Sequence, residues 1–187
     1  YGVLMALYHS TTSSNYHWME IAGGAAGDPI WGRTNGGGGS EIATTTTGYT
    51  ANVWYHATYS CLSTTSRTIY INAGSSHTRT DNLTVSLNRT GIGAGLYTGT
   101  TIEYFNGHIA HAGIWNIALN VKEITDLQTR IPLSIRPDAL VSYWPLGDFY
   151  GNTDNDIRTA KNDLTPTNSP TFSQGPRILY THYLGGS

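Results

Sequence analysis

The chain alternates between short apolar segments and polar segments that are rich in Gly, Ser, Thr and Asn. Runs in which every second residue is apolar are typical of β-strands, and the polar segments between them favour turns. We expect strands over residues 3–8, 16–22, 30–33, 41–47, 53–60, 68–72, 83–88, 91–95 and 140–146. The pattern therefore predicts a domain built mainly of β-sheets.

One segment near the middle of the chain changes its period. Both alternating faces of residues 104–115 carry apolar side chains, which favours an inner strand that is covered on both sides. Asn120 followed by Glu123 has the spacing of a capping box. Apolar residues then recur at helical spacing as far as Pro132, which ends the pattern. We expect one short helix near residues 121–130.

The composition agrees with a β-rich chain. Its 187 residues include 22 glycines and 13 tyrosines, and only 12% of the residues are charged. This length suits one domain with a sizeable hydrophobic core. We expect an all-β fold in which two antiparallel sheets form a sandwich.

Several motifs occur in an order and at a spacing that resemble a known family. Upstream lie Trp54 with His56, the segment from Arg67 to Gly74, and Gly91-Ile92-Gly93; the central segment carries Gly107, Ile109, Ile114, Trp115, Asn116, Leu119, Glu123 and Ile124; downstream lies the Tyr143-Trp144-Pro145-Leu146 segment. Over roughly residues 1–178 these motifs together resemble laminin-G-like domains of the concanavalin A-like lectin/glucanase superfamily. The resemblance implies a two-sheet jelly-roll sandwich. We assign residues 1–131 to its body, 132–180 to a C-terminal strand and wrapping extension of the same domain, and 181–187 to a mobile tail.

The order of the motifs raises a question about one sheet position. In many relatives the strand that resembles residues 140–146 opens the domain, and a Trp-containing strand follows it. Here that strand would precede Tyr1. The C-terminal extension could supply it, residues before Tyr1 could supply it, or a neighbouring chain could add it. Because an uncovered sheet edge favours pairing, we expect assembly with other copies or other subunits.

Charge and hydropathy argue against two classes of partner. The formal net charge is −2, and the ten Lys and Arg residues form no basic stripe, so we expect no nucleic-acid partner. No run of 18 apolar residues occurs, so we expect no membrane-spanning helix. The single cysteine excludes an intrachain disulfide.

The glutamates do not form the pattern of a glycosidase. Retaining enzymes on this fold need two carboxylates about 5–5.5 Å apart, which on one strand requires acids two or four residues apart. The glutamates are Glu20, Glu41, Glu103 and Glu123, and none has an acid two or four positions further on. We expect that the chain is not an enzyme; a glycoside hydrolase built from distant acids ranks third among the interpretations.

Two sets of residues are candidates for binding. Aromatic and polar side chains on or near the predicted loops suit a sugar; they are Asn15, Tyr16, Trp18, Asp28, Trp31, Tyr97 and Tyr104. Oxygen ligands within one loop suit Ca²⁺; they are Asp148, Asn152, Asp154 and Asp156. The alternative for the tryptophans is a place in the core, and for the acids a solvated Asx-rich turn.

The sequence leaves two functional interpretations open. The first is a non-catalytic structural or recognition domain, a surface or decorating subunit of a phage particle or similar assembly, with glycan-binding loops. This rests on the resemblance to domains of phage and bacterial surface proteins. The alternative is a stand-alone lectin-like carbohydrate-binding module of a secreted or surface protein, with or without Ca²⁺. Both predict an extracellular or virion-surface location.

Overall fold

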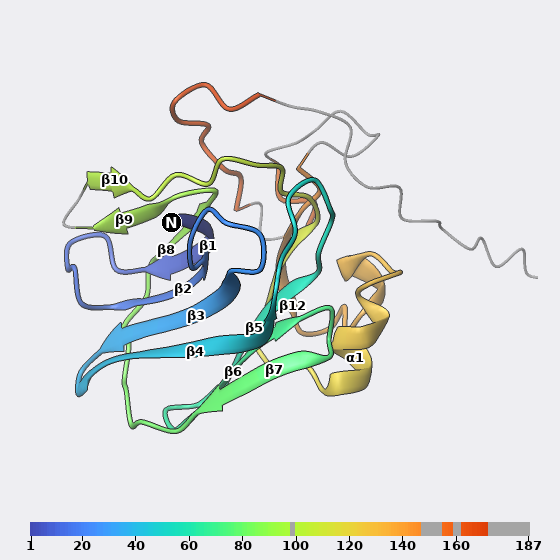
Figure 1. Ribbon diagram of the computed structural model, residues 1–187. Coiled ribbons are helices and arrows are strands. Elements are labelled where there is room, and N and C mark those ends of the chain that lie inside the picture. Colours follow the sequence, from blue (N-terminus) through green and yellow to red (C-terminus); the bar gives the residue numbers. More distant parts are fainter. Residues whose placement is uncertain (98–99, 147–154, 159–161, 172–187) are drawn as a thin grey trace, which may run out of the picture. The chain divides into compact units, whose positions relative to one another are not determined.

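The computed structural model describes residues 1–97, 100–146, 155–158 and 162–171 (Figure 1). The predicted mobile tail lies outside these residues. The chain divides into two compact units, residues 1–107 and 108–187, and each is described by itself.

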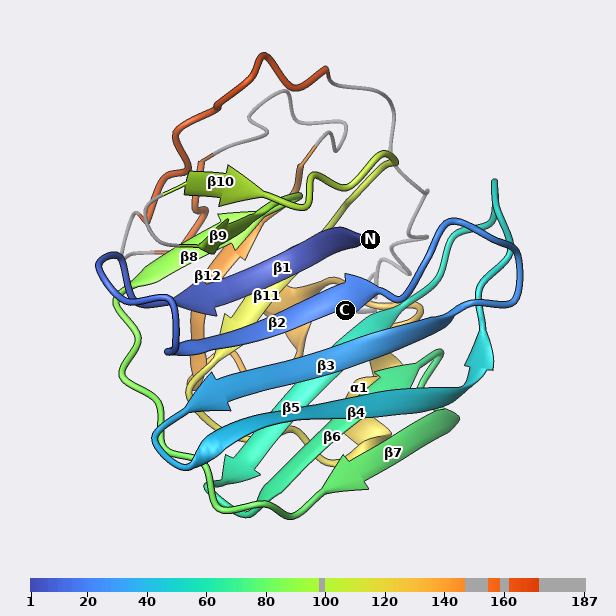
Figure 2. The same ribbon diagram turned by 60° about the vertical axis from the view of Figure 1, so that its left-hand side comes forward.

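The first unit contains a five-stranded antiparallel sheet (Figure 2). Its strands, in spatial order, are β4 (Gly39–Gly48), β3 (Pro29–Gly36), β2 (Tyr16–Ile21), β1 (Gly2–Tyr8) and β8 (Arg89–Ile92). Strands β1 to β4 thus pair with their neighbours in the sequence, as short turns between alternating segments predict.

A three-stranded antiparallel sheet packs against one face of the five-stranded sheet (Figure 2). It consists of β5 (Ala57–Ser63), β6 (Ser66–Ile71) and β7 (Ser75–Arg79). Ile30 and Ala43 from the larger sheet and Ile69 and Ile71 from the smaller sheet are buried together between them. The predicted all-β sandwich is therefore confirmed.

The other face of the five-stranded sheet also carries a core. Val3, Ala6, Tyr16 and Trp18 are buried there, and Ile102 packs against them. A small ladder of β9 (Gly95–Tyr97) and β10 (Thr100–Ile102) leads into this region.

The two sheets of the sandwich meet along one side of the first unit. Strands β4 and β7 are joined there by side chains: the Thr46 hydroxyl lies 2.7 Å from the Ser75 hydroxyl, which also accepts a hydrogen bond from the Thr47 backbone. In the described part of the chain, β8 and β5 stand at the opposite ends of their sheets.

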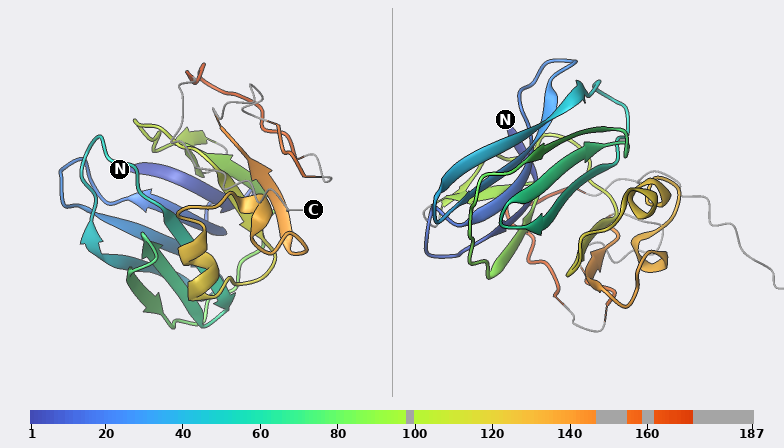
Figure 3. Two further views of the ribbon diagram at one scale, coloured as in Figure 1. Left: turned by 90° about the vertical axis from the view of Figure 1, so that its right-hand side faces the viewer. Right: turned by 90° about the horizontal axis from the view of Figure 1, so that it is seen from below.

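The second unit is built on an antiparallel pair, β11 (Ala112–Trp115) and β12 (Leu140–Trp144). The helix α1 (Val121–Asp126) and the 3₁₀ helix η1 (Pro132–Ser134) lie in the connection between these strands (Figure 3). Buried apolar side chains line this unit: Ile124, Ile135, Leu140, Tyr143 and Trp144. No helix in the described ranges has the length and apolar character to cross a membrane.

The start of the helix is as predicted, but its end is not. Asn120 accepts a hydrogen bond from the Glu123 backbone at 3.0 Å, and the Glu123 carboxylate accepts one from the Asn120 backbone at 2.8 Å. The predicted extent to residue 130 is too long, because α1 ends at Asp126. Beyond it Gln128 and Thr129 bond to carbonyls three residues back, which tightens the chain into turns.

Several strand predictions are wrong in extent. Residues 104–111 are not part of a long inner strand, and His111 has a φ of +55°, outside the β region. Residues 53–56 precede the ladder that begins at Ala57, and residues 83–88 make only an isolated bridge at Thr84. Strand β7 was not predicted, because its Ser-Ser-His-Thr-Arg sequence carries no apolar pattern.

Candidate functional site

The face of the five-stranded sheet that turns away from β5, β6 and β7 carries the candidate site. On β3, Ile30, Gly32 and Thr34 are buried, and Trp31, Arg33 and Asn35 alternate with them, half-buried. Since successive side chains of a strand point to opposite sides, Trp31, Arg33 and Asn35 form a row on that second face.

The neighbouring strand completes the arrangement. In the register of β2 and β3, Glu20 lies opposite Trp31, Trp18 opposite Arg33 and Tyr16 opposite Asn35. We call these six residues the outer face of β2 and β3. The β2 members are almost fully buried and the β3 members are half-buried, so the face opens toward solvent over β3.

An ion pair connects the two rows of the outer face. Arg33 Nη2 lies 2.7 Å from Glu20 Oε1, with the Glu20 side chain fully buried and the Arg33 side chain 23% exposed. Burial, the largest single influence, opposes the charge on Arg33, but Glu20, Tyr16 and Glu103 together outweigh it and raise the pKa of the guanidinium. Arg33 is therefore a fixed cation at the rim of the site.

A second carboxyl group reaches the same place from a distant part of the chain. Glu103 directly follows β10, and its carboxyl is near enough to the Glu20 carboxyl to change the proton affinity of Glu20. Its backbone has a φ of +54°, and its carbonyl accepts a hydrogen bond from Val3 on β1 at 2.8 Å. The ladder to β1 thus holds a residue whose conformation is rare outside glycine.

The two carboxyl groups change the proton affinity of the site. Burial raises the pKa of Glu20 to about 7; Arg33 opposes this rise, and the nearby Glu103 carboxyl adds to it. Two carboxylates in contact repel each other, so the pair retains a proton far above the usual range of a glutamic acid.

Aromatic rings border the charged groups. The Arg33 guanidinium lies 5.7 Å from the centre of the Trp31 ring, within the range of a cation–π contact. The Tyr1 ring also contacts Trp31: the ring centres are 5.7 Å apart and the ring planes are tilted by 35°. Tyr1 is 69% exposed. On the neighbouring strand β2, Tyr16 stacks on Trp18 with the ring centres 4.2 Å apart. The site therefore combines flat apolar area with directed polar groups.

The structure separates the predicted sugar-binding residues into different environments. Trp31 lies in the half-buried row, whereas Tyr16 and Trp18 are buried beside it on β2. Tyr104 directly follows Glu103 and is 49% exposed. The side chain of Tyr97 lies outside the described part of the structure.

The other two predicted sugar-binding residues organise turns. The Asn15 side chain accepts a hydrogen bond from the Ser86 backbone at 3.1 Å, and Asp28 accepts one from the Ala25 backbone at 2.8 Å. The structure therefore does not bring Asn15 and Asp28 into the row of Trp31, Arg33 and Asn35.

Sequence reasoning missed Tyr1, Glu20, Arg33, Asn35 and Glu103 as members of this site. The alternation Trp31-x-Arg33-x-Asn35 was a readable signal, because it sets an aromatic, a cation and an amide on one side of a strand. No local signal joins Glu20 to Glu103, since the spacing of residues along one strand cannot relate two distant segments.

Of the four predicted calcium ligands, the structure describes only Asp156. Asp148, Asn152 and Asp154 lie outside the described residues. Asp156 is buried, and its carboxylate accepts hydrogen bonds from the backbone of Tyr143, Arg158 and Asn162 at 2.9–3.1 Å. In the ranges that the structure describes, no group of three or more His, Cys, Asp or Glu side chains could hold a metal ion.

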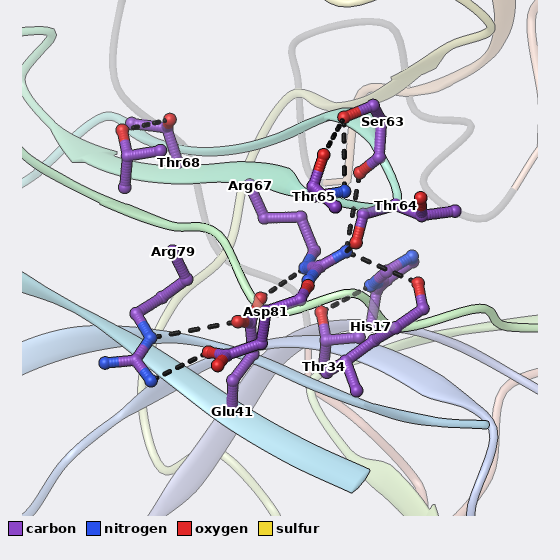
Figure 4. Close-up of polar contacts among 12 residues, drawn as sticks. His17, Thr34, Glu41, Ser63, Thr64, Thr65, Arg67, Thr68, Arg79 and Asp81 are labelled. Atoms are coloured by element: carbon purple, nitrogen blue, oxygen red, sulfur yellow. Dashed lines mark hydrogen bonds and ion pairs between the residues drawn. The ribbon is translucent and has the colours of Figure 1, made fainter. Parts of the chain in front are cut away.

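A second polar cluster lies between the sheets of the first unit and has a structural role (Figure 4). Arg67, 1% exposed, donates to the Glu41 carboxylate, to the Asp81 carbonyl and, at 2.7 Å, to the Thr64 carbonyl. Arg79 adds contacts to Glu41 at 3.7 Å and to the Asp81 carboxylate at 2.8 Å. These bonds join β4, β6 and β7 to the segment that follows β7.

His17 and Thr34 lie beside this cluster (Figure 4). The Thr34 hydroxyl lies 2.7 Å from His17 Nδ1 and 2.7 Å from the Tyr59 hydroxyl. Burial, aided by the nearby Arg67 charge, lowers the pKa of His17 to about 4, so the imidazole is neutral at physiological pH. The chain His17–Thr34–Tyr59 satisfies polar groups between the sheets.

Comparison with known proteins places the fold in a family. A family model described as the concanavalin A-like lectin/glucanases superfamily matches residues 3–125. No curated protein sequence matches the chain. A 2.1 Å crystal structure of an S-layer domain-containing protein (residues 221–444) from Clostridium thermocellum is 22% identical, with a TM-score of 0.37. That match covers 67% of this chain and 61% of the other.

Proposed function

Because the chain belongs to the concanavalin A-like lectin/glucanase superfamily, we propose that it is a non-catalytic recognition domain that binds glycans. The site is the outer face of β2 and β3. The observation that carries this proposal is the row of Trp31, Arg33 and Asn35 on one side of β3, open toward solvent beside the buried side chains of β2.

The chemistry of this row suits a sugar. The ring of Trp31 offers a flat apolar surface on which the C–H face of a pyranose can lie. Arg33 donates hydrogen bonds, and the Asn35 amide both donates and accepts, so adjacent hydroxyls of a sugar find complementary partners. The Glu20 ion pair fixes the direction of Arg33, which lowers the cost of ordering that side chain on binding.

The acids at the site argue for binding rather than hydrolysis. Glu103 Oε2 is buried away from water, so this acid is not placed to activate a water molecule. Glu20 is also fully buried and paired with Arg33, so it is not free to attack a sugar or to activate water.

Trp31 provides the direct test. We expect the purified protein to bind immobilised glycans on an array, and Trp31→Ala to weaken the best hit at least about tenfold in calorimetry. Trp54→Ala is the control, because Trp54 is a tryptophan outside the outer face; it is 45% exposed and lies in the connection between β4 and β5. An empty array, or equal loss in the two variants, would contradict the proposal.

We further propose that the domain belongs to a larger extracellular or virion-surface assembly, such as the surface of a phage particle. Strands β8 and β5 stand at the ends of their sheets in the described residues, and such edges favour strand addition by another chain. Sedimentation over a wide range of concentration tests this second proposal: a single monomeric species throughout would count against self-assembly.

A further inference from the structure

The site contains more negative than positive charge. Glu20 lies opposite Val3 in the pairing of β1 and β2, and the Val3 N–H donates to the Glu103 carbonyl, so the two acids flank Val3. Arg33 is the cation paired with Glu20. The proton that Glu20 retains up to a pH near 7 compensates for this imbalance. A buried acid pair that keeps a proton at this pH is a place where another cation would be stabilised.

Unpartnered polar atoms lie at the same place. Among the described residues, the carboxylate oxygens Glu20 Oε2 and Glu103 Oε2 are buried without a hydrogen-bond partner, as is Arg33 Nε beside them. Glu20 is fully buried, so its carboxylate cannot turn to water instead. Since an unmet buried acceptor destabilises the folded protein, these oxygens favour a ligand that carries N–H donors.

The surroundings select the kind of cation. No group of metal-ligating side chains occurs in the described ranges, so the site does not have the ligand set of a metal ion. Instead the exposed Tyr1 and the half-buried Trp31 stand beside the acids. Aromatic faces together with carboxylates are the surroundings that bind an organic ammonium group.

We propose that the glycan bound at the outer face is an amino sugar with a free amine, whose ammonium group binds at the Glu20–Glu103 pair while its ring lies on Trp31. This inference rests on the proposed function and names its substrate class. Glu103 is only partly buried and Arg33 is 23% exposed, so the ammonium group approaches the pair from the side of these two residues.

A matched pair of ligands tests the inference on the unmodified protein. Calorimetry at pH 7 compares a β-1,4-linked glucosamine tetrasaccharide with its fully N-acetylated counterpart, which has the same rings and linkages but no charge. We expect the free-amine ligand to bind at least about tenfold more tightly, the size of one ammonium contact with an acid and aromatic rings.

A variant then assigns the preference to the acid pair. Glu103→Gln removes a charge and keeps the shape, so it should abolish the preference for the free amine; Asp138→Asn removes an exposed charge in the second unit and should leave it unchanged. Circular dichroism checks that each variant is folded. Should Glu103→Gln not fold, Tyr1→Ala, which alters an exposed ring, should reduce the preference instead.

The outcomes separate the two proposals. Equal or tighter binding of the N-acetylated ligand would overturn the amino-sugar inference and leave glycan binding intact. Absence of binding by both ligands, with hits for neutral glycans on the array, would also overturn this inference alone. Absence of binding to any glycan would overturn the proposed function as well.

Discussion

Arg33 on β3 pairs with Glu20 on β2 along a diagonal, although the residue directly opposite Glu20 in the ladder is Trp31. In this diagonal geometry the Arg33 guanidinium lies 5.7 Å from the centre of the Trp31 ring. One side chain thus connects a buried acid to an open aromatic surface. The ion pair fixes the position of Arg33 in the β3 row. Because the Glu20 carboxyl titrates, the stability of this arrangement depends on pH.

Glu20→Gln should change how stability depends on pH. The folded-state pKa of Glu20 is about 7, raised from 4.5, so the folded protein holds more protons than the unfolded chain between these values. The stabilisation by the protonated form is therefore complete below pH 4.5 and is lost as pH rises through 7, by up to about 3 kcal/mol. Glutamine does not titrate. Urea unfolding from pH 4.5 to 8 should show the wild type losing stability relative to the variant.

The difference between the two proteins is the quantity to follow, because other groups titrate in both. Glu123→Gln provides a comparison, since Glu123 lies in the capping box of α1 in the second unit. Parallel stability curves for wild type and Glu20→Gln would show that the carboxyl pair does not hold the proton.

The local parts of the fold were readable from the sequence. Asn120 and Glu123 predicted the start of the helix correctly, because a capping box depends only on two residues three positions apart. The β2 and β3 strands were readable because their alternation reflects one side packed in the sandwich. By contrast, β7 is held by ladder bonds and by serine and histidine contacts to β4, which leave no apolar pattern.

The site was readable only in part. Trp31 was found by residue type, and its neighbours Arg33 and Asn35 could have been found from the same alternation. Glu103 could not, because its place depends on a backbone bond to Val3 and on a positive φ. Glu20 and Glu103 meet through tertiary packing, so a search for acids on one strand misses them.

Arg67→Lys should strongly destabilise the protein, although it keeps the charge. The guanidinium of Arg67 binds the Glu41 carboxylate and the carbonyls of Thr64 and Asp81 at once, and an ammonium group lacks that planar set of donors. Lysine can pair with the Glu41 carboxylate but leaves buried carbonyls without donors, which costs about 1–3 kcal/mol for each one. Chemical denaturation measures the loss.

The matched control for this substitution is Arg89→Lys. Arg89 is exposed on β8 and donates to the carbonyl of its neighbour Asn88 at 2.9 Å. We expect little change in its unfolding free energy. A small effect of Arg67→Lys, similar to that of Arg89→Lys, would mean that the cluster between the sheets adds little to stability.

Gly32→Ala should destabilise the sandwich through one contact. A Cβ atom at Gly32 would lie 2.5 Å from Cε2 of Tyr59, which packs across from β3. Overpacking of this kind costs about 1–3 kcal/mol. Gly24→Ala is the control, because nothing lies within 4 Å of a Cβ atom there. In a Tyr59→Ala background the cost of Gly32→Ala should largely disappear, and an unchanged cost would refute the contact as its cause.

Asp156→Asn tests whether the one described member of the predicted calcium set serves the fold or an ion. Burial alone would favour the protonated acid, but hydrogen bonds from the backbone of Tyr143, Arg158 and Asn162 outweigh it and lower the pKa of Asp156. This stabilisation is present above the unfolded-state pKa of about 4 and is lost as pH falls through the lower folded-state value.

An asparagine in this place has one acceptor oxygen and turns an NH₂ group toward backbone donors. We therefore expect Asp156→Asn to lower the unfolding free energy at pH 7 by about 3 kcal/mol, and the deficit to shrink in acid. Thermal unfolding with Ca²⁺ and with a chelator distinguishes the two roles. If the carboxylate serves only the backbone, the deficit is the same in both conditions. A deficit that appears only with Ca²⁺ would instead make Asp156 an ion ligand, because binding to the folded state alone adds stability in proportion to occupancy.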